Sequence, residues 1–299
     1  MTTTTNASAP TSPTHSFSEQ DLLSETFWRS LFPELTILGR LRGEFVLNWL
    51  DEQSMSVAAN KMLVEGYFQE RDPVLVELSG LLSTAISRCV QLGIPPVFIF
   101  LFDETWAAFF RQHATFSAFL GEQYQTLPDF WAWHVDPRAG QAGWRPHRDK
   151  GRTALAADGT PLSMTVWIPL TEATPLNGCI YVLPANRDPV YNTENELNYK
   201  VDYPSIRALP GQPGDWFCWN QALLHWGAQS SPFATSPRMS MALEFQRSDV
   251  PAFNTPLLGT APVLSFQIRL QLVAKQILQY QHMYPLPEHL QRFAQHVLA

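Results

Sequence analysis

The 299-residue sequence has few cysteines, a shortage of basic residues and no long apolar run. Its three cysteines, Cys89, Cys179 and Cys218, are far apart in apolar surroundings, so we expect buried, reduced thiols rather than disulfides or a metal site. Lys and Arg number 20 against 27 Asp and Glu, and the resulting net charge of −7 argues against nucleic acid as a partner. No stretch approaches 18 consecutive apolar residues, so we expect no membrane span.

Neither end of the sequence shows a targeting signal. Residues 1–20 are rich in Thr, Ser, Ala and Pro and lack the basic and apolar regions of a signal peptide, so we expect a disordered leader. The last five residues, 295–299, do not resemble a peroxisomal signal. A cytoplasmic location is therefore expected.

The apolar pattern predicts helices, then a β-rich core, then helices. Within residues 21–124 we expect helices at Asp21 to Leu31, Leu38 to Val64, Asp72 to Leu92 and Glu104 to Leu120, and a buried strand at Val97 to Phe102. Residues 125–250 alternate short strands with turns and predict a β-barrel or sandwich. Residues 251–299 form a helical segment ending in an amphipathic helix at Pro287 to Leu298. We expect a single catalytic domain overall.

The sequence His147-Arg148-Asp149, followed much later by His225, has the composition of a 2-His-1-carboxylate metal site. Side chains at i and i+2 of a strand point to the same face, so His147 and Asp149 can reach one metal. The third ligand can come from any strand that folds back alongside. Such a set holds Fe(II) by one face and leaves three positions open.

A second pair of the same form, His134 and Asp136, competes with the first. Asp136 runs directly into residues 137–140, Pro-Arg-Ala-Gly, which stop a strand. Asp149 instead precedes a polar loop, Gly151 to Thr160, and then the apolar run Met164 to Leu170. Because active sites favour strand ends beneath loops, this context favours His147 and Asp149.

The segments around these residues resemble the phytanoyl-CoA dioxygenase family. The likeness covers about Gln125 to Gln246, and its motifs occur in the family's order. They are 143–149 (GWRPHRD), 164–170 (MTVWIPL), 177–184 (NGCIYVLP), 213–215 (PGD), 224–225 (LH) and 237–240 (PRMS). The resemblance implies a double-stranded β-helix (a jelly-roll, cupin-like core) with N- and C-terminal helices. It also implies Fe(II) held by His147, Asp149 and His225, with 2-oxoglutarate and O2 as cosubstrates.

The resemblance further places Arg238, Ser240 and Trp167 at the 2-oxoglutarate site. A guanidinium matches a carboxylate through two hydrogen bonds, and Ser240 lies on the same strand face as Arg238. Taken from the residues alone, Arg238 fits a surface salt bridge equally well. The sequence departs from the family at Gly227, where many relatives carry a small hydroxyl residue two positions after the distal His. That hydroxyl contact to the cosubstrate is therefore missing.

The expected function is hydroxylation of an unactivated C–H bond of a small molecule in specialised metabolism. In halogenating relatives a small residue replaces the metal-binding carboxylate, so Asp149 favours hydroxylation. Desaturation or ring formation on the same scaffold stays open, as does a divalent-metal hydrolase or isomerase using the same ligands. A non-catalytic ligand-binding relative is the third class.

The sequence does not identify the substrate or the oligomeric state. Basic residues cluster around the metal motif and are a candidate site for an anionic substrate, or else a solvated rim: Arg138, Arg145, Arg148, Lys150 and Arg152. Tryptophans 144, 216, 219 and 226 are candidate pocket residues. Strand parity puts Trp216 with Cys218 on one face and Phe217 with Trp219 on the other, without saying which face is internal.

Overall fold

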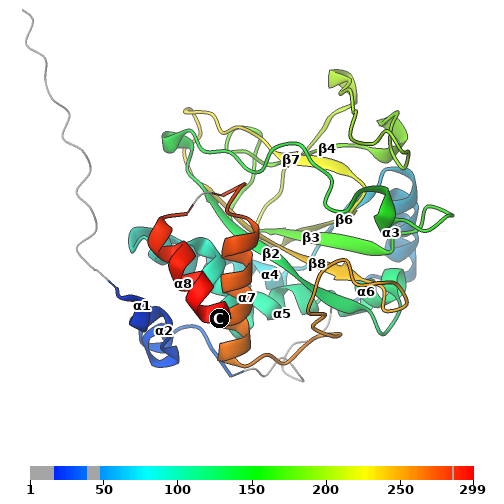
Figure 1. Cartoon of the computed structure of the whole chain (residues 1–299). Helices are drawn as coiled ribbons and strands as arrows, with labels where there is room; N and C mark the ends of the chain where they lie inside the picture. Colours follow the sequence, from blue (N-terminus) through cyan, green and yellow to red (C-terminus); the bar gives the residue numbers. More distant parts are fainter. Residues whose placement is uncertain (1–16, 39–47, 285) are drawn as a thin grey trace, which may run out of the picture.

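Two antiparallel sheets facing one another form the centre of the molecule. The computed structural model describes residues 17–38, 48–284 and 286–299. The large sheet has the strand order β1-β6-β3-β8-β2, and the small sheet has the order β5-β4-β7. Figure 1 shows β4 and β7 above the large sheet and the helices α4 and α5 beneath it. The arrangement is the expected double-stranded β-helix with flanking helices, although helical residues outnumber strand residues.

The strands of the large sheet pair in a continuous antiparallel register. Thr165 of β3 lies between Trp219 of β6 and Glu244 of β8, so three side chains from separate strands share one face. The strands of this sheet are β1 (Tyr67–Arg71), β2 (Gln125–Val135), β3 (Ser163–Pro169), β6 (Asp215–Asn220) and β8 (Arg238–Gln246). Those of the small sheet are β4 (Ile180–Leu183), β5 (Arg207–Leu209) and β7 (Leu224–Gly227).

Helices bury the face of the large sheet that points away from the small one. Phe116 packs against Phe245 of β8 with ring centroids 4.4 Å apart and against Trp216 of β6 at 6.5 Å. Trp216 and Cys218 therefore face the helices, and Trp219 faces the other sheet. The covering helices are α4 (Val74–Gln91), α5 (Asp103–Phe110) and α6 (His113–Leu120). All three cysteines are buried and free, as expected.

One expectation for residues 21–124 is wrong. The apolar run at Val97 to Phe102 is not a strand but a buried 3-10 helix, η1 (Pro96–Leu101), which begins at a proline. A short run that is apolar at every position fits a buried helix as well as a buried strand, so periodicity could not separate them. The same segment also contains a strand, β1, which forms the edge of the large sheet.

The helix expected over Glu104 to Leu120 is divided between α5 and α6. The break falls at Arg111 and Gln112, whose side chains both turn to Asp72 at the start of α4. Arg111 donates to both Asp72 oxygens, at 2.6 Å and 2.9 Å, and Gln112 donates at 3.0 Å. These buried bonds tie the helical layer to the turn that follows β1.

The remaining helices agree in part with the pattern. Two helices, α1 (Glu19–Leu22) and α2 (Glu25–Leu31), stand in place of the one expected at Asp21 to Leu31, and they are separate because Ser24 caps the second. Of the helix expected over Leu38 to Val64, the described part of the chain contains α3 (Glu52–Val64), and residues 39–47 lie outside that part. Of the expected disordered leader 1–20, residues 1–16 also lie outside it, whereas residues 19 and 20 are helical and belong to α1. The chain ends in α7 (Phe266–Gln279) and α8 (Glu288–Leu298), the second of which was expected.

The α4 helix is long and apolar enough to cross a membrane when judged by length and composition alone. Its mean hydropathy is 1.2, and 39% of it is buried within the protein. A single helix of this kind is weak evidence for a membrane span. Its buried residues pack under η1 and the large sheet.

We expect the buried pair of Arg111 with Asp72 to dominate local stability. Arg111→Ala leaves a carboxylate buried without its main partner, which costs about 3–5 kcal/mol in the free energy of unfolding. Arg292→Ala is the control, because Arg292 pairs with Glu288 at the surface and such pairs contribute at most about 1 kcal/mol. Urea unfolding followed by circular dichroism measures both, and equal losses would contradict the prediction.

Candidate metal centre and its cavity

The structure brings His147, Asp149 and His225 together. Their candidate ligand atoms all lie within 4.8 Å of one another. The residue pair His147 and His225 is held by two reciprocal backbone hydrogen bonds of 3.0 Å, an isolated antiparallel bridge at the start of β7. His147 and Asp149 were expected on a strand, but only His147 forms a ladder pair and Asp149 lies in the bend that follows.

Hydrogen bonds fix which nitrogen of each histidine faces the centre. Nδ1 of His147 lies 2.7 Å from the carbonyl oxygen of Arg145, and Nδ1 of His225 lies 3.1 Å from that of Leu223. A carbonyl oxygen only accepts, so each Nδ1 carries the proton. In the neutral form of each ring, Nε2 then has a lone pair directed at the centre, which is the form that binds a metal.

Asp149 is oriented in the same way. Its Oδ2 accepts hydrogen bonds from Thr165 Oγ1 at 2.6 Å and Trp219 Nε1 at 3.2 Å. Gln221 donates to Thr165 at 3.0 Å and so fixes the direction of the threonine hydroxyl. The remaining oxygen, Oδ1, faces His147 Nε2 at 3.3 Å and His225 Nε2 at 3.5 Å. Three donor atoms therefore point at one place, each held by a bond on its far side.

The protonation states of the group favour a cation between them. Burial raises the pKa of Asp149, but His225, His147 and Thr165 outweigh it and hold the pKa well below its usual range. Burial lowers the pKa of His225 to about 4, although Asp149 opposes the shift. The group therefore holds an ionised carboxylate and at least one neutral imidazole at neutral pH.

The rival pair His134 and Asp136 does not form such a centre. His134 lies on β2 opposite Met239, between Trp133 and Val135. Trp131 and Trp133 line the internal cavity, so the alternation of a strand turns His134 to the other side. In the described part of the chain, only His147, Asp149 and His225 form a group of three with metal-binding spacing.

The three side chains open onto a cavity between the two sheets. The cavity holds about 520 Å³ of space, and its walls come from β2, β3, β6 and β8 on one side and β4 and β7 on the other. Trp144 and Trp219 line it, as the sequence allowed, whereas Trp216 does not. Trp226 instead stacks on Tyr181 at 5.9 Å.

Arg238 lies in this cavity wall and has no acidic partner among the described residues. Its side chain is 1% exposed, so the surface salt bridge is wrong. Nη1 donates to Ser240 Oγ, the guanidinium lies 5.8 Å from the Trp167 ring, and Nε has no partner. Burial lowers the pKa of Arg238 to about 10, so the group stays cationic at neutral pH. A buried cation without a counter-ion is costly unless a ligand supplies the negative charge.

Two glycines face each other beside Arg238. A Cβ on Gly227 would lie 2.5 Å from the Gly143 Cα, and a Cβ on Gly143 would lie 2.6 Å from the Gly227 Cα and 3.2 Å from Arg238 Nη2. The backbones approach this closely because Gly227 N–H donates to the Trp144 carbonyl at 2.9 Å. The hydroxyl residue common in relatives therefore has no room at position 227.

Two carboxylates in the cavity were missed from the sequence. Asp129 of β2 and Glu244 of β8 line the end near Thr165, and Lys150 lies close to both. Strand alternation puts Glu244 on the same face as Arg238, so the orientation of Glu244 can be predicted from the sequence. The orientation of Asp129 cannot be predicted in this way, because Asp129 lies where the β2 register shifts between Thr126 and Phe130.

Several members of the basic cluster near the metal motif are already engaged with acidic side chains. Arg148 pairs with Asp188 at 2.6 Å inside the protein, and Arg152 lies 3.7 Å from Glu194. Lys150 pairs with Glu244 at 3.1 Å. The cavity wall includes none of the five basic residues, so they do not form a site for an anion there.

We expect the contact between Gly227 and Gly143 to tolerate no side chain. Gly227→Ala forces the two backbones apart and lowers the free energy of unfolding by about 1–3 kcal/mol, as overpacking does. Gly80→Ala is the matched control, because a Cβ there meets nothing within 4 Å and glycine costs a helix interior about 0.5–1 kcal/mol. Denaturant unfolding compares the two, and a neutral Gly227→Ala would show that the backbones separate easily.

The chain matches one protein-family model and is similar to several solved structures. The model of the phytanoyl-CoA dioxygenase (PhyH) family matches residues 68–236, more than half of the chain. A search of curated proteins gave no match. The non-heme monooxygenase ThoJ in its Ni complex has a TM-score of 0.53 and 13% identity, and the match covers 79% of this chain and 99% of that one.

The epimerase SnoN in complex with Fe3+, alpha ketoglutarate and nogalamycin RO has a TM-score of 0.50 and 13% identity, with 72% of this chain and 97% of that chain covered. At these identities the structures establish the fold. The family match and the group of three ligands agree with the expected iron and 2-oxoglutarate. The chain therefore belongs to the phytanoyl-CoA dioxygenase family and is an enzyme of the Fe(II)- and 2-oxoglutarate-dependent oxygenase type.

Proposed function

We propose that the protein hydroxylates an unactivated C–H bond of a small molecule in specialised metabolism. One observation carries this proposal: a buried arginine without an acidic partner shares a cavity with three preorganised metal ligands. A metal site alone suits many reactions. The combination with an unpaired buried cation is what a dicarboxylate cosubstrate requires.

In this proposal, His147 Nε2, Asp149 Oδ1 and His225 Nε2 hold Fe(II). The donor set is a 2-His-1-carboxylate face, and the hydrogen bonds on Nδ1 and Oδ2 keep those donors pointing inward. When bound, the iron and 2-oxoglutarate supply the activation of O2, with decarboxylation to succinate and CO2. Thr165, Trp219 and Gln221 serve as positioning residues for Asp149.

Arg238 binds the far carboxylate of 2-oxoglutarate in this proposal. Its guanidinium faces the cavity with Nε unused, and the Ser240 hydroxyl accepts from Nη1, so its own proton is available to a carboxylate. Trp167 packs beside the guanidinium and limits its movement. Because Gly227 offers no hydroxyl, Arg238 and Ser240 supply the polar contacts on this side.

Asp149 directs the proposed outcome toward hydroxylation. Its carboxylate occupies the position that must be empty for a halide to bind the metal. Desaturation and ring formation use the same residues with another substrate pose, and SnoN shows that an epimerase can share the fold. A hydrolase or isomerase using these ligands has no use for a buried cation at Arg238, so we favour the oxygenase reaction.

A small-molecule substrate and a cytoplasmic location are parts of the same proposal. SnoN was crystallised with nogalamycin RO, a small molecule, and the cavity of this protein, with its aromatic walls and few polar groups, is of the kind that binds small molecules. The free, buried cysteines suit a reducing compartment. We treat 125–250 as the catalytic core and 21–124 and 251–299 as the segments that pack on it in one domain.

We expect alanine at any of His147, Asp149 or His225 to abolish Fe(II) binding and succinate formation, because two remaining ligands hold the metal weakly. His134→Ala is the control, since its side chain faces away from the cavity and its loss leaves iron content unchanged. Metal analysis of anaerobically loaded protein and succinate release measure both. Iron loss in His134→Ala with retention in His147→Ala would show that the other pair is the site.

The same succinate assay decides the class of reaction. The proposal requires one succinate for each hydroxylated product, with O2 consumed. Turnover under strict anaerobiosis, or without succinate, would favour the hydrolase or isomerase instead.

We expect Arg238→Ala to raise the KM for 2-oxoglutarate while iron content stays near that of the wild type. Loss of one partner of a buried charge pair costs about 2–5 kcal/mol, roughly 30-fold or more in affinity. Arg238→Lys recovers part of this, because the ammonium keeps the charge without the two-pronged geometry. Ser240→Ala costs less, about 0.5–1.5 kcal/mol and up to about 3 with a charged acceptor. An unchanged KM in Arg238→Ala would remove Arg238 from the cosubstrate site.

A further inference from the structure

The two ends of the cavity present different chemical groups, a guanidinium at one end and two carboxyl groups at the other. Arg238 and Glu244 lie on the same face of β8, six residues and therefore about 20 Å of strand apart. Apart from the two histidines, Arg238 is the cavity's single basic side chain among the described residues. Asp129 and Glu244 line the other end. With Arg238 assigned to the cosubstrate and Asp149 to the metal, these two carboxylates have no role in the proposed chemistry.

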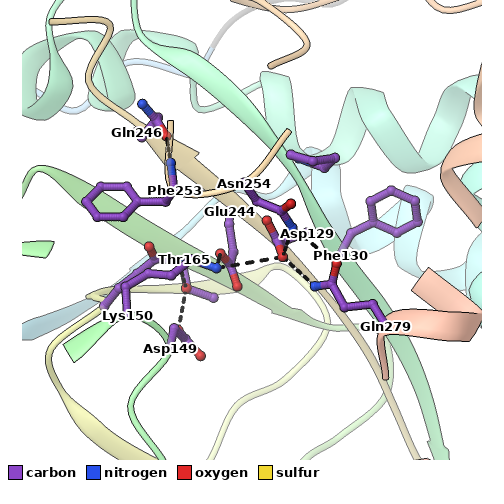
Figure 2. Close-up of polar contacts among 12 residues, drawn as sticks. Asp129, Phe130, Asp149, Lys150, Thr165, Glu244, Gln246, Phe253, Asn254 and Gln279 are labelled. Carbon is purple, nitrogen blue, oxygen red and sulfur yellow. Dashed lines mark hydrogen bonds and ion pairs between the residues drawn. The ribbon is translucent and has the colours of Figure 1, made fainter. Parts of the chain in front are cut away.

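Hydrogen bonds hold the Asp129 carboxylate through one of its oxygens and leave the other without a donor. Figure 2 shows the side chains of Asn254 and Gln279 next to its carboxylate. Both donate to Oδ1, at 2.8 Å and 2.6 Å, and Tyr280 Oη lies 3.4 Å from that oxygen. The other oxygen, Oδ2, is buried and has no hydrogen-bond partner. A buried carboxylate oxygen without a donor is costly, so the site is suited to a ligand that brings one.

Glu244 shares one lysine with Asp129. Lys150 Nζ lies 3.1 Å from Glu244 Oε2 and 3.7 Å from Asp129 Oδ1 (Figure 2). Neither Lys150 nor Lys275 lines the cavity, whereas Asp129 and Glu244 do, and Lys275 bonds to Asn254 and Gln279. Burial raises the pKa of Glu244 to about 8, against the effect of Lys150. A cation in the cavity therefore stabilises the ionised form of Glu244.

Aromatic rings form the walls beside these carboxylates. Tyr280 lies 4.6 Å from the Trp144 ring and 5.6 Å from the Trp131 ring, measured between centroids, and Trp131 and Trp144 are 6.3 Å apart. The faces of such rings attract cations, most strongly when water is excluded. The indole N–H groups of Trp131 and Trp144 have no partner and are free to donate to an oxygen of a ligand.

We propose that the substrate carries a protonated amine, which Asp129 and Glu244 bind against the rings of Trp131, Trp144 and Tyr280. This inference rests on the proposed function, since it takes the cavity as the substrate site. Thr165 bonds to Asp149 and pairs directly with Glu244 across β3 and β8, so the acidic end adjoins the metal ligands. The carbon that is oxidised therefore lies only a few bonds from the nitrogen.

The charge of the ligand is tested with three probes of similar size and different charge: 2-phenylethylamine, 2-phenylethanol and 3-phenylpropanoate. Binding is measured by calorimetry under anaerobic conditions, on wild-type protein loaded with Fe(II) and 2-oxoglutarate and on metal-free protein. We expect the amine to bind at least about tenfold more tightly than the alcohol, since a hydrogen bond to a charged group contributes about 1.5–3 kcal/mol. Weaker or equal binding of the amine, or none at millimolar concentration, overturns the proposal.

Variants separate the acidic end from the cosubstrate end. Asp129→Asn and Glu244→Gln keep the shape of each side chain, and we expect each to weaken amine binding by about 10- to 100-fold with 2-oxoglutarate affinity unchanged. Arg238→Ala is expected to weaken 2-oxoglutarate binding and to leave the affinity for the amine unchanged. Asp249→Asn is the matched control, because that carboxylate pairs with Arg247 at the surface.

The pattern of losses also distinguishes the two proposals. If Arg238→Ala leaves 2-oxoglutarate binding intact while Asp129→Asn still weakens the amine, the cosubstrate assignment fails and the amine site stands. Unchanged amine affinity in both acidic variants overturns the amine site alone. A parallel fall in thermal stability and in the affinity for 2-oxoglutarate in those variants assigns the carboxylates a structural role and also overturns it.

Discussion

The two backbone hydrogen bonds between His147 and His225 are the interaction on which the rest of the site depends. They join a loop outside the regular strands to β7, and so bring together ligands that are far apart in the sequence. The same antiparallel approach continues to Gly143 and Gly227, where two backbones meet without room for a side chain. The metal ligands are therefore positioned by backbone pairing, and their donor atoms are then aimed by bonds to carbonyl oxygens and to Thr165.

Sequence motifs could predict the metal ligands because each residue type has few chemical uses. His147, Asp149, His225 and Arg238 do lie around one cavity, although their roles remain predictions until they are tested. The double-stranded β-helix was predicted through the ordered motifs of the family and is confirmed. The prediction of a strand at Val97 to Phe102 failed because burial on all sides removes the periodicity that separates a helix from a strand.

The group of carboxyl side chains at one end of the cavity could not be predicted from the sequence. Asp129, Lys150 and Glu244 come from three separate segments and meet only when β2, β8 and the loop after Asp149 are assembled. The sequence groups Lys150 with neighbouring arginines as a candidate anion site, because it shows which charged residues are close along the chain. It does not show which charged residues on other strands lie close in space. In the structure its amine lies against two carboxyl groups and outside the cavity wall, so the carboxyl groups and not the amine face the cavity.

The glycine at position 227 follows from the same geometry and has a consequence for binding. A hydroxyl residue there, as in many relatives, needs a wider separation of the two backbones than Gly143 allows. The close approach brings the loop that carries His147 against Arg238, whose guanidinium is buried. A charge pair formed in such a place is stronger than one in water, and Arg238 with Ser240 can then hold a carboxylate without the third contact. In the proposed function, this enclosure stands in for the hydroxyl contact that position 227 cannot supply.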